Sequence, residues 1–165
     1  SDAQKARDMG AQVIIVSLHW GRETQTDLSD FQISTADAIT KSGLIDLVIG
    51  HHAHVVQKIE QANGIWTVFG LSNLISYLPT TDAFPAKTQD GMIVTANITL
   101  NPDGSVQVEK PVVHPTWVDK YNGVVVRPIL TDLADPSVPD DIKAKLIISL
   151  DRTRSVVGDF FPTNP

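Results

Sequence analysis

Two short apolar runs mark the first fifty residues of the chain. They span residues 12–18 and 45–49, are rich in valine and isoleucine, and contain few polar positions. Such runs are typical of strands that are buried on both faces of a sheet. Residues 29–42 between them show apolar positions at helical spacing, and Gly43 marks a stop. The apolar stripe consists of Phe31, Ala36, Ala38 and Ile39. The pattern predicts a β-α-β unit whose parallel strands end at one edge of a sheet.

The second half of the chain has a different pattern, in which short apolar segments are separated by turn residues. Residues 55–60 and 65–70 predict a strand pair around Ala62-Asn63-Gly64. A helix is expected over 2–10 and a loop over 78–90. A hairpin is expected over 91–100 and 105–113, with its turn at 101–104. An irregular stretch over 114–135 is expected to precede a helix over about 136–155 that begins with Asp135 and Pro136. These elements predict the α/β class, with a β-α-β unit followed by antiparallel hairpins in mixed sheets.

Length and composition are those of an ordinary globular protein. The 165 residues suit one domain with a substantial core, and 42% of them are hydrophobic. The net charge of -6 argues against a nucleic-acid partner. The chain has no cysteine, which excludes disulfides, thiolate zinc sites and cysteine nucleophiles. No apolar stretch approaches the length of a membrane span. The first residues resemble the middle of a helix and not a signal peptide, so we expect a piece of a longer protein.

Four histidines lie at the ends of the two apolar runs. His19 closes the first run, and the second leads into His51, His52 and His54. Imidazole is the commonest metal ligand near neutral pH, and α/β proteins place their chemistry at the carboxyl ends of parallel strands. On an extended segment His52 and His54 point to one side, and His51 faces away unless the chain turns. The pattern predicts part of a metal site, with Glu23 as a ligand or an outer carboxylate.

These residues also have a purely structural interpretation. A lone histidine at a strand end is most often a polar residue satisfied by its neighbours, whereas three histidines in four residues are harder to explain in that way. Trp20 is expected to be a packing residue, and His114 a structural one. A dinuclear hydrolase also needs carboxylates and an amide, and the chain has no strand-terminal Asp-x-His or Gly-Asp motif. The site is therefore expected to be incomplete.

Three motifs, taken in order, resemble those of the bacterial CapA family, the capsule and poly-gamma-glutamate synthesis proteins. The family shows a His-Trp-Gly-x-Glu element, a Gly-His-His-Pro-His-Val-x-Gln element and a later Ser-Leu-Gly-Asn-Phe element. Their counterparts here lie at residues 18–23, 46–57 and 70–74, and Gln32 between the first two is part of the same resemblance. Departures from the family pattern are Ala53 for proline, Ser72 for glycine and Leu74 for phenylalanine. The resemblance covers about residues 10–115.

The CapA family is similar to the calcineurin-like metallophosphoesterases. That similarity implies an α/β sandwich in which mixed sheets are flanked by helices, with metal ions at the strand ends. The implied metal ligands are His19, His51, His52 and His54, where His51 is the alternative to His52 as the first histidine of the family's histidine pair. The implied catalytic residues are His19, Glu23 and His52, and the implied neighbours of the site are Gln57 and Asn73.

The resemblance also implies a role in the synthesis, export or anchoring of an anionic extracellular polymer at the extracytoplasmic face of the bacterial envelope. The implied cofactor is a divalent cation (Mn, Zn, Mg or Fe), which would activate water for attack at phosphorus or polarise a carbonyl. Residues 1–115 would be the C-terminal half of a CapA-like domain and 116–165 an extension. The missing half is an expected partner, so we expect the chain alone to be inactive and to bind metal weakly. A non-catalytic scaffold or polymer-binding subunit is one alternative, and an unrelated phosphoester hydrolase is another.

A domain cut in two leaves a strand with an unpaired apolar edge. Such edges pair with another chain or are covered. We therefore expect either a homodimer or a cover formed by residues 114–155. The apolar stripe of that cover would be Ile142, Leu146, Ile147 and Leu150.

Overall fold

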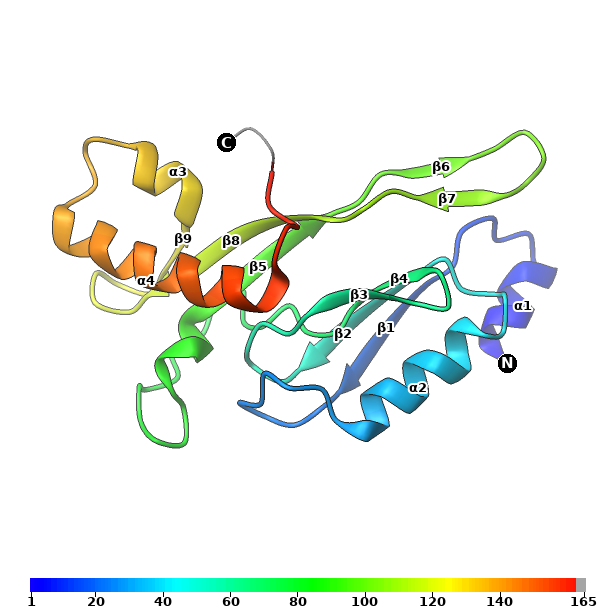
Figure 1. Ribbon diagram of the computed structural model, residues 1–165, viewed down its shortest axis with the longest axis horizontal. Helices are drawn as coiled ribbons and strands as arrows, with labels where there is room; N and C mark the ends of the chain where they lie inside the picture. Colours follow the sequence, from blue (N-terminus) through cyan, green and yellow to red (C-terminus); the bar gives the residue numbers. More distant parts are fainter. Residues whose placement is uncertain (163–165) are drawn as a thin grey trace.

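The computed structural model describes residues 1–162 as two sheets flanked by helices, with a protruding hairpin (Figure 1). The first half holds, in chain order, α1 (Asp2–Asp8), β1 (Ile15–Trp20), α2 (Asp30–Thr40), β2 (Leu47–His52), β3 (Ile59–Ala62) and β4 (Ile65–Val68). The second half holds the 3-10 helix η1 (Ala86–Gln89), β5 (Asp90–Thr95), β6 (Ile98–Leu100), β7 (Val106–Val108), β8 (Val112–Asp119), β9 (Val125–Pro128), α3 (Ile129–Ala134) and α4 (Asp140–Val157). The predicted α/β class with mixed sheets is confirmed.

The first sheet contains the predicted β-α-β unit. Its strand order is β1-β2-β4-β3, and β2 runs parallel to both of its neighbours. α2 connects β1 to β2, and His19 lies opposite His51 in the strand pairing. β3 and β4 form the predicted antiparallel pair, and the turn residues Asn63 and Gly64 both have positive φ, as a two-residue type I′ turn requires.

One face of the first sheet is covered, and the other is partly open. On the covered face Trp20, Val48 and Phe69 form a buried cluster with residues of α1 and α2. On the other face alternate residues of β1 are exposed, and Ile15 keeps 49% of its surface. The prediction that β1 is buried on both faces is therefore wrong. β1 lies at the edge of the sheet, and on its second face Ile15 borders a pocket whose other wall includes Val94 and Ile98.

The buried face of α2 differs from the predicted stripe. Ser29 and Gln32 form a reciprocal capping box at the start of the helix. This arrangement turns Gln32 inward, where it is 0% exposed, and leaves Phe31 65% exposed. The predicted stripe is therefore correct for Ala36 and wrong for Phe31 and Ala38, which is also exposed.

The second sheet is antiparallel, with the order β5-β8-β9, and carries α3 and α4. Trp117 of β8 packs with Ile142, Leu146 and Leu150 of α4. The prediction that residues 114–135 are irregular is wrong, because β8 continues to residue 119 and is followed by β9 and α3. β8 also spans the expected boundary between residues 115 and 116, and the division of the chain at that point stays a prediction.

The last helix begins later than expected. α4 starts at Asp140, directly after Pro139. Asp135 does not cap it, because its side chain accepts a hydrogen bond from the backbone N–H of Ser137 (2.8 Å) in a preceding turn. Ile147 is 50% exposed, so the predicted stripe is wrong at that one position.

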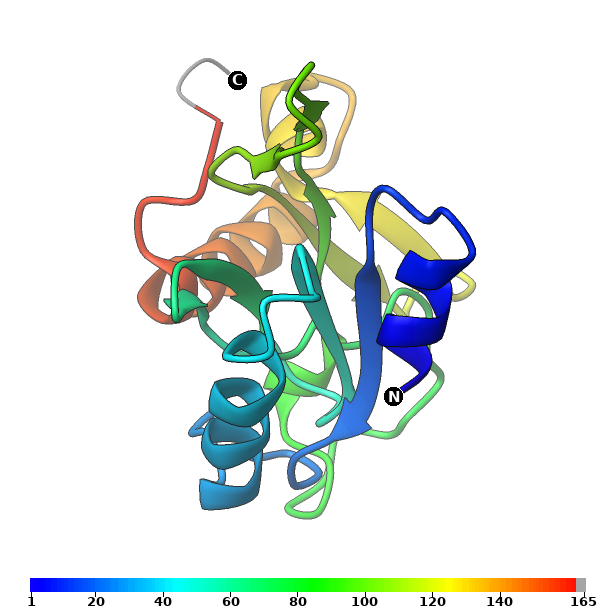
Figure 2. The same cartoon turned by 90° about the vertical axis from the view of Figure 1, so that its right-hand side faces the viewer.

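α4 does not cover β1, one of the two outer strands of the first sheet, but its C-terminal end packs at the other side, where Val157 clusters with Ile59 and Val68. It packs on β5 and β8, and in both views it lies away from β1 (Figure 1, Figure 2). The predicted stripe therefore covers the second sheet and not β1, and the homodimer stays a prediction. Among residues 1–162, no helix combines the length and the apolar character needed to cross a bilayer.

Candidate functional site

The carboxyl ends of β1 and β2 lie side by side and carry the histidines. In the parallel pairing His19 is opposite His51, and Trp20 is opposite His52. The loop that leaves β1 is tied to the loop that leaves β2, because the Thr24 N–H donates to the carbonyl of Ala53 (2.7 Å). The prediction that His19 and the 51–54 cluster share one sheet edge is confirmed.

Trp20 anchors the end of β1 in the core. Its indole Nε1–H donates to the carbonyl of Phe69 (2.9 Å), and the two aromatic rings stack at 5.4 Å with an interplanar angle of 9°. A Cβ at Gly50 would lie 2.0 Å from the Phe69 carbonyl oxygen and 2.3 Å from the indole nitrogen. Only glycine fits between them, so the Trp20–Gly50–Phe69 contact fixes β1 against β2 just before the histidines. Trp20 is the packing residue that the sequence predicts.

His52 turns toward His19 because its backbone is not extended. A residue in register with Trp20 would normally point to the face opposite that of His19. His52 has a φ of +97°, which departs from the regular alternation. Its ring centroid lies 4.4 Å from that of His19 and 6.3 Å from that of His54. His51 takes no part in these ring contacts, which favours His52 over its competitor.

Asn73 fixes the orientation of His54. Nδ1 of His54 lies 2.7 Å from Oδ1 of Asn73. The amide of Asn73 is oriented by the hydrogen bond that its Nδ2 donates to the carbonyl of Thr88 (3.0 Å). Oδ1 is thus the acceptor, so Nδ1 of His54 carries the proton and Nε2 of the neutral ring has a free lone pair. This is the arrangement in which a histidine serves as a ligand or as a proton acceptor.

Gln57 supports the site from beneath and does not line it. Its amide is 0% exposed, accepts a hydrogen bond from Nε2 of Gln32 (2.8 Å) and donates to the carbonyl of Gln25 (3.0 Å). Gln57 therefore links α2 and the loop after β1 to the segment that follows the histidines. Gln25 was not predicted as a member of this network, and Gln32 was noted only among the residues that resemble the CapA family, although its capping-box spacing from Ser29 was also visible.

Unfavourable backbone conformations gather around the histidines. Among residues 1–162, six non-glycine residues have positive φ, and four of them lie at the end of β2 or in the loops of the site: Thr24, His52, His54 and Ser72. Such conformations cost free energy and persist where the surroundings impose them, which is common at functional sites. The hydroxyl of Ser72 is also buried without a hydrogen-bond partner. The strain thus points to these loops as the functional part of the sheet edge.

The described residues do not by themselves fit a closed metal site. Glu23 is exposed and lies outside the histidine contacts. Among residues 1–162, no group of three or more histidine, aspartate or glutamate side chains is arranged to hold one metal ion. Ring contacts join His19, His52 and His54; His51 lies opposite His19 in the strand pairing without such a contact among residues 1–162, and Glu23 is exposed. Tight metal binding by this chain therefore needs more donors than these three rings, which do not form a ligand group as they stand.

Comparisons with known proteins match the first part of the chain. The family described as bacterial capsule synthesis protein PGA_cap matches residues 1–78. A protein of Bacillus subtilis (strain 168), named PGA biosynthesis protein CapA, is 31% identical over 114 residues, which are 69% of this chain and 27% of that protein. A protein of Bacillus anthracis, named capsule biosynthesis protein CapA, is 29% identical over 75 residues, which are 46% of this chain and 18% of that protein. The chain spans about a quarter or less of the length of these relatives.

Proposed function

The chain is a member of the bacterial capsule synthesis family PGA_cap, and we propose from that membership that it acts in the biosynthesis of an anionic extracellular polymer, either a capsule or poly-gamma-glutamate. Two relatives are named for these processes. Synthesis, export and anchoring of the polymer are all compatible with the proposal, and its place of action would be the extracytoplasmic face of the cell envelope.

The histidine cluster is the proposed centre of this activity. The observation that carries the proposal is the juxtaposition of His19, His52 and His54 at the carboxyl ends of two parallel strands. His54, held by Asn73 with Nε2 free, can accept a proton or a cation. His52 and His19 present a second pair of rings within reach of the same bound group. One exposed imidazole (His19) and two half-buried ones (His52 and His54) at the ends of the two strands suit the binding of an anionic polymer better than they suit packing.

The finer part of the proposal is a metal-dependent hydrolase or transferase. A divalent cation (Mn, Zn, Mg or Fe) would take its histidine ligands from His19, His52 and His54, together with donors beyond those that the described residues bring together. Phosphoesters or amide-like polymer bonds are the substrates to test. A missing half of the domain would be the source of the further donors, and the chain alone would then be inactive.

A non-catalytic polymer-binding subunit is the second candidate. The observation that favours it is the lack of a three-donor metal group among the described residues. In that case the three rings would bind polymer carboxylates or phosphates directly when they are protonated.

Metal analysis and polymer binding, measured on the protein at its natural length, separate the two candidates. Stoichiometric metal that is lost in His52→Gln, together with phosphodiesterase or amidase activity, would support the enzyme. Polymer binding without metal, weakened in His52→Gln and unchanged in His114→Gln, would support the binding subunit. His114 is a matched control because it is exposed on β8, away from the histidine cluster, where its Nε2 lies 3.1 Å from the hydroxyl of Thr95. A protein that binds neither metal nor polymer would contradict the proposal.

A further inference from the structure

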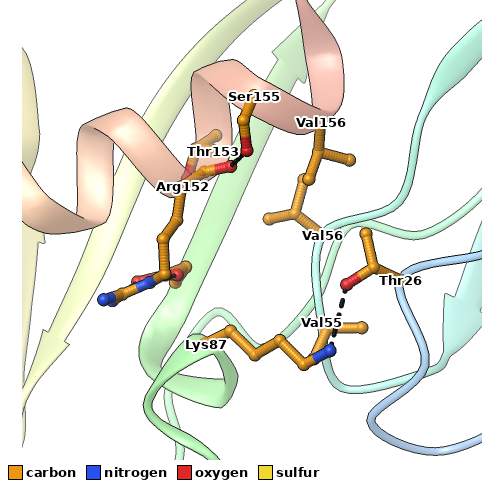
Figure 3. Close-up of a pocket in the computed structure, with 9 residues that line it drawn as sticks. Thr26, Val55, Val56, Lys87, Arg152, Thr153, Ser155 and Val156 are labelled. Atoms are coloured by element: carbon orange, nitrogen blue, oxygen red, sulfur yellow. Dashed lines mark hydrogen bonds and ion pairs between the residues drawn. The ribbon is translucent and has the colours of Figure 1, made fainter.

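A second candidate site lies between α4 and the loops of the first sheet. It is a pocket of about 210 Å³, and it shares no residue with the histidine cluster (Figure 3). We propose that this pocket binds the carboxylate end of a short aliphatic chain. Substitutions at different residues test the pocket and the histidine cluster, so a negative result for one proposal does not contradict the other.

Lys87 supplies an uncompensated positive charge. It extends from η1 across the mouth of the pocket, and Nζ donates to the hydroxyl of Thr26 (3.2 Å) (Figure 3). Among residues 1–162, no carboxylate forms an ion pair with Lys87. An ammonium carries three donors, so two remain for a ligand. A half-buried cation without a counter-ion favours an anion at this place.

The one acidic group in the pocket is already neutralised. Both oxygens of the Asp90 carboxylate are engaged by Arg152, through Nε and Nη2 at 2.6 Å each. Ser149 donates a third hydrogen bond to Asp90, also at 2.6 Å. Asp90 therefore neither repels an incoming anion strongly nor offers a free lone pair to a cation. The charge left over in the pocket is that of Lys87.

Thr153 presents a hydroxyl that has no partner. The residue lines the pocket from α4 and is 1% exposed. A threonine within a helix usually bonds its hydroxyl to a backbone carbonyl one turn earlier, but Oγ1 of Thr153 makes no hydrogen bond in the structure. A buried unsatisfied hydroxyl is unfavourable, and a ligand oxygen placed beside it would relieve that cost.

The remaining wall of the pocket selects the class of anion. Val55 and Val56 from the first half of the chain face Val156 of α4 (Figure 3). An inorganic anion makes no use of such apolar surface, whereas methylene groups gain from burial against it. The Lys87 ammonium lies beside Val55, so a bound carboxylate on a short aliphatic stem would meet a cation and apolar surface together (Figure 3). A glutamyl unit contains that group, as do free dicarboxylic acids.

The test follows backbone amide resonances of ¹⁵N-labelled protein during titration with three probes. Glutarate carries the proposed group, glutaramide is its neutral counterpart, and inorganic phosphate is a bare anion. We expect glutarate to shift the resonances of Thr26, Val55, Lys87 and the 152–156 segment. We expect Lys87→Gln to weaken glutarate binding about tenfold or more, since it removes a charge-assisted hydrogen bond. Lys5→Gln, which removes the same charge from exposed α1, should leave binding unchanged.

Thr153→Val separates a ligand-binding role from a structural one. The change keeps the shape of the side chain and removes the orphan hydroxyl, so the melting temperature should stay equal or rise while glutarate binding weakens. The proposal is overturned if glutarate causes no shifts at the pocket, or if glutaramide shifts them as well as glutarate does. It is also overturned if phosphate binds more tightly than glutarate, or if neither variant alters glutarate binding.

Discussion

At the scale of single residues, the histidine cluster depends on conformations that residue types do not disclose. The sequence correctly predicts that His19 and the 51–54 cluster meet, because parallel strand ends share an edge. The resemblance already favours His52 over His51, but the positive φ by which His52 reaches His19 could not be predicted for a non-glycine residue. The Gln32–Gln57 contact was equally hidden, because it joins positions far apart in the chain.

The Asn73–His54 hydrogen bond leads to a prediction about the tautomer. Asn73→Ala removes the acceptor of the Nδ1 proton, so the neutral ring of His54 should lose its bias toward the Nδ1–H form. The side-chain ¹⁵N shifts of His54 measure this bias directly. Asn97→Ala is the control, because Asn97 bonds to Glu109 on an exposed hairpin. An unchanged tautomer in Asn73→Ala would show that Asn73 does not hold the ring.

At the scale of elements, β8 shows why part of the fold escaped prediction. Proline inside a sheet argues against a central strand, because it has no N–H to donate. Pro115 is tolerated because it pairs with Met92, whose N–H points away from β8 to the carbonyl of Leu71 (3.2 Å). The pairing of β8 with β9 starts only at Thr116, so the missing N–H of Pro115 breaks neither ladder. The sequence showed a proline, and only the pairing shows that its position is harmless.

The end of β8 carries an ion pair that should make the second sheet sensitive to acid. Burial raises the pKa of Asp119, but hydrogen bonds from Asn122, Arg127 and the Tyr121 backbone outweigh it, so the pKa is lowered. A lowered pKa in the folded state means that the stabilisation is present above the unfolded value near 3.8 and is lost as the pH falls through the folded value.

Asp119→Asn should therefore lower the free energy of unfolding by about 2 kcal/mol at pH 7, since it removes charge-assisted hydrogen bonds from a buried carboxylate. Urea unfolding between pH 7 and pH 2 measures this. The difference between the wild type and Asp119→Asn should shrink toward pH 2. Asp2→Asn, an exposed change on α1, is the control. A difference that stays constant with pH would rule out the ionic explanation.

At the scale of the whole molecule, β1 is an outer strand of the first sheet, and no described strand pairs with its free side. β1 ends the strand order, and Ile15 is half exposed on the second face of the strand. The apolar stripe of α4 was predicted to cover such an edge, but three of its residues pack with Trp117 on the second sheet instead.

Edge strands of this kind pair with other chains. We expect the chain to self-associate as its concentration rises, and we expect Ile15→Lys to shift it toward the monomer, because a charge on the open face opposes pairing. Light scattering across a concentration series measures this. Ile148→Lys is the control, since Ile148 is also exposed but lies on α4. A wild-type chain that stays monomeric at high concentration would remove the need for a partner at β1.

The central claim is that the histidine cluster serves the production of an extracellular polymer. The most direct test is polymer yield in a capsule-forming or poly-gamma-glutamate-forming bacterium that carries the protein at natural length in place of its own copy. His52→Gln should reduce the yield at least tenfold with unchanged protein level, and His114→Gln should leave it at the wild-type level. A normal yield from His52→Gln, or an equal loss from both variants, would contradict the claim.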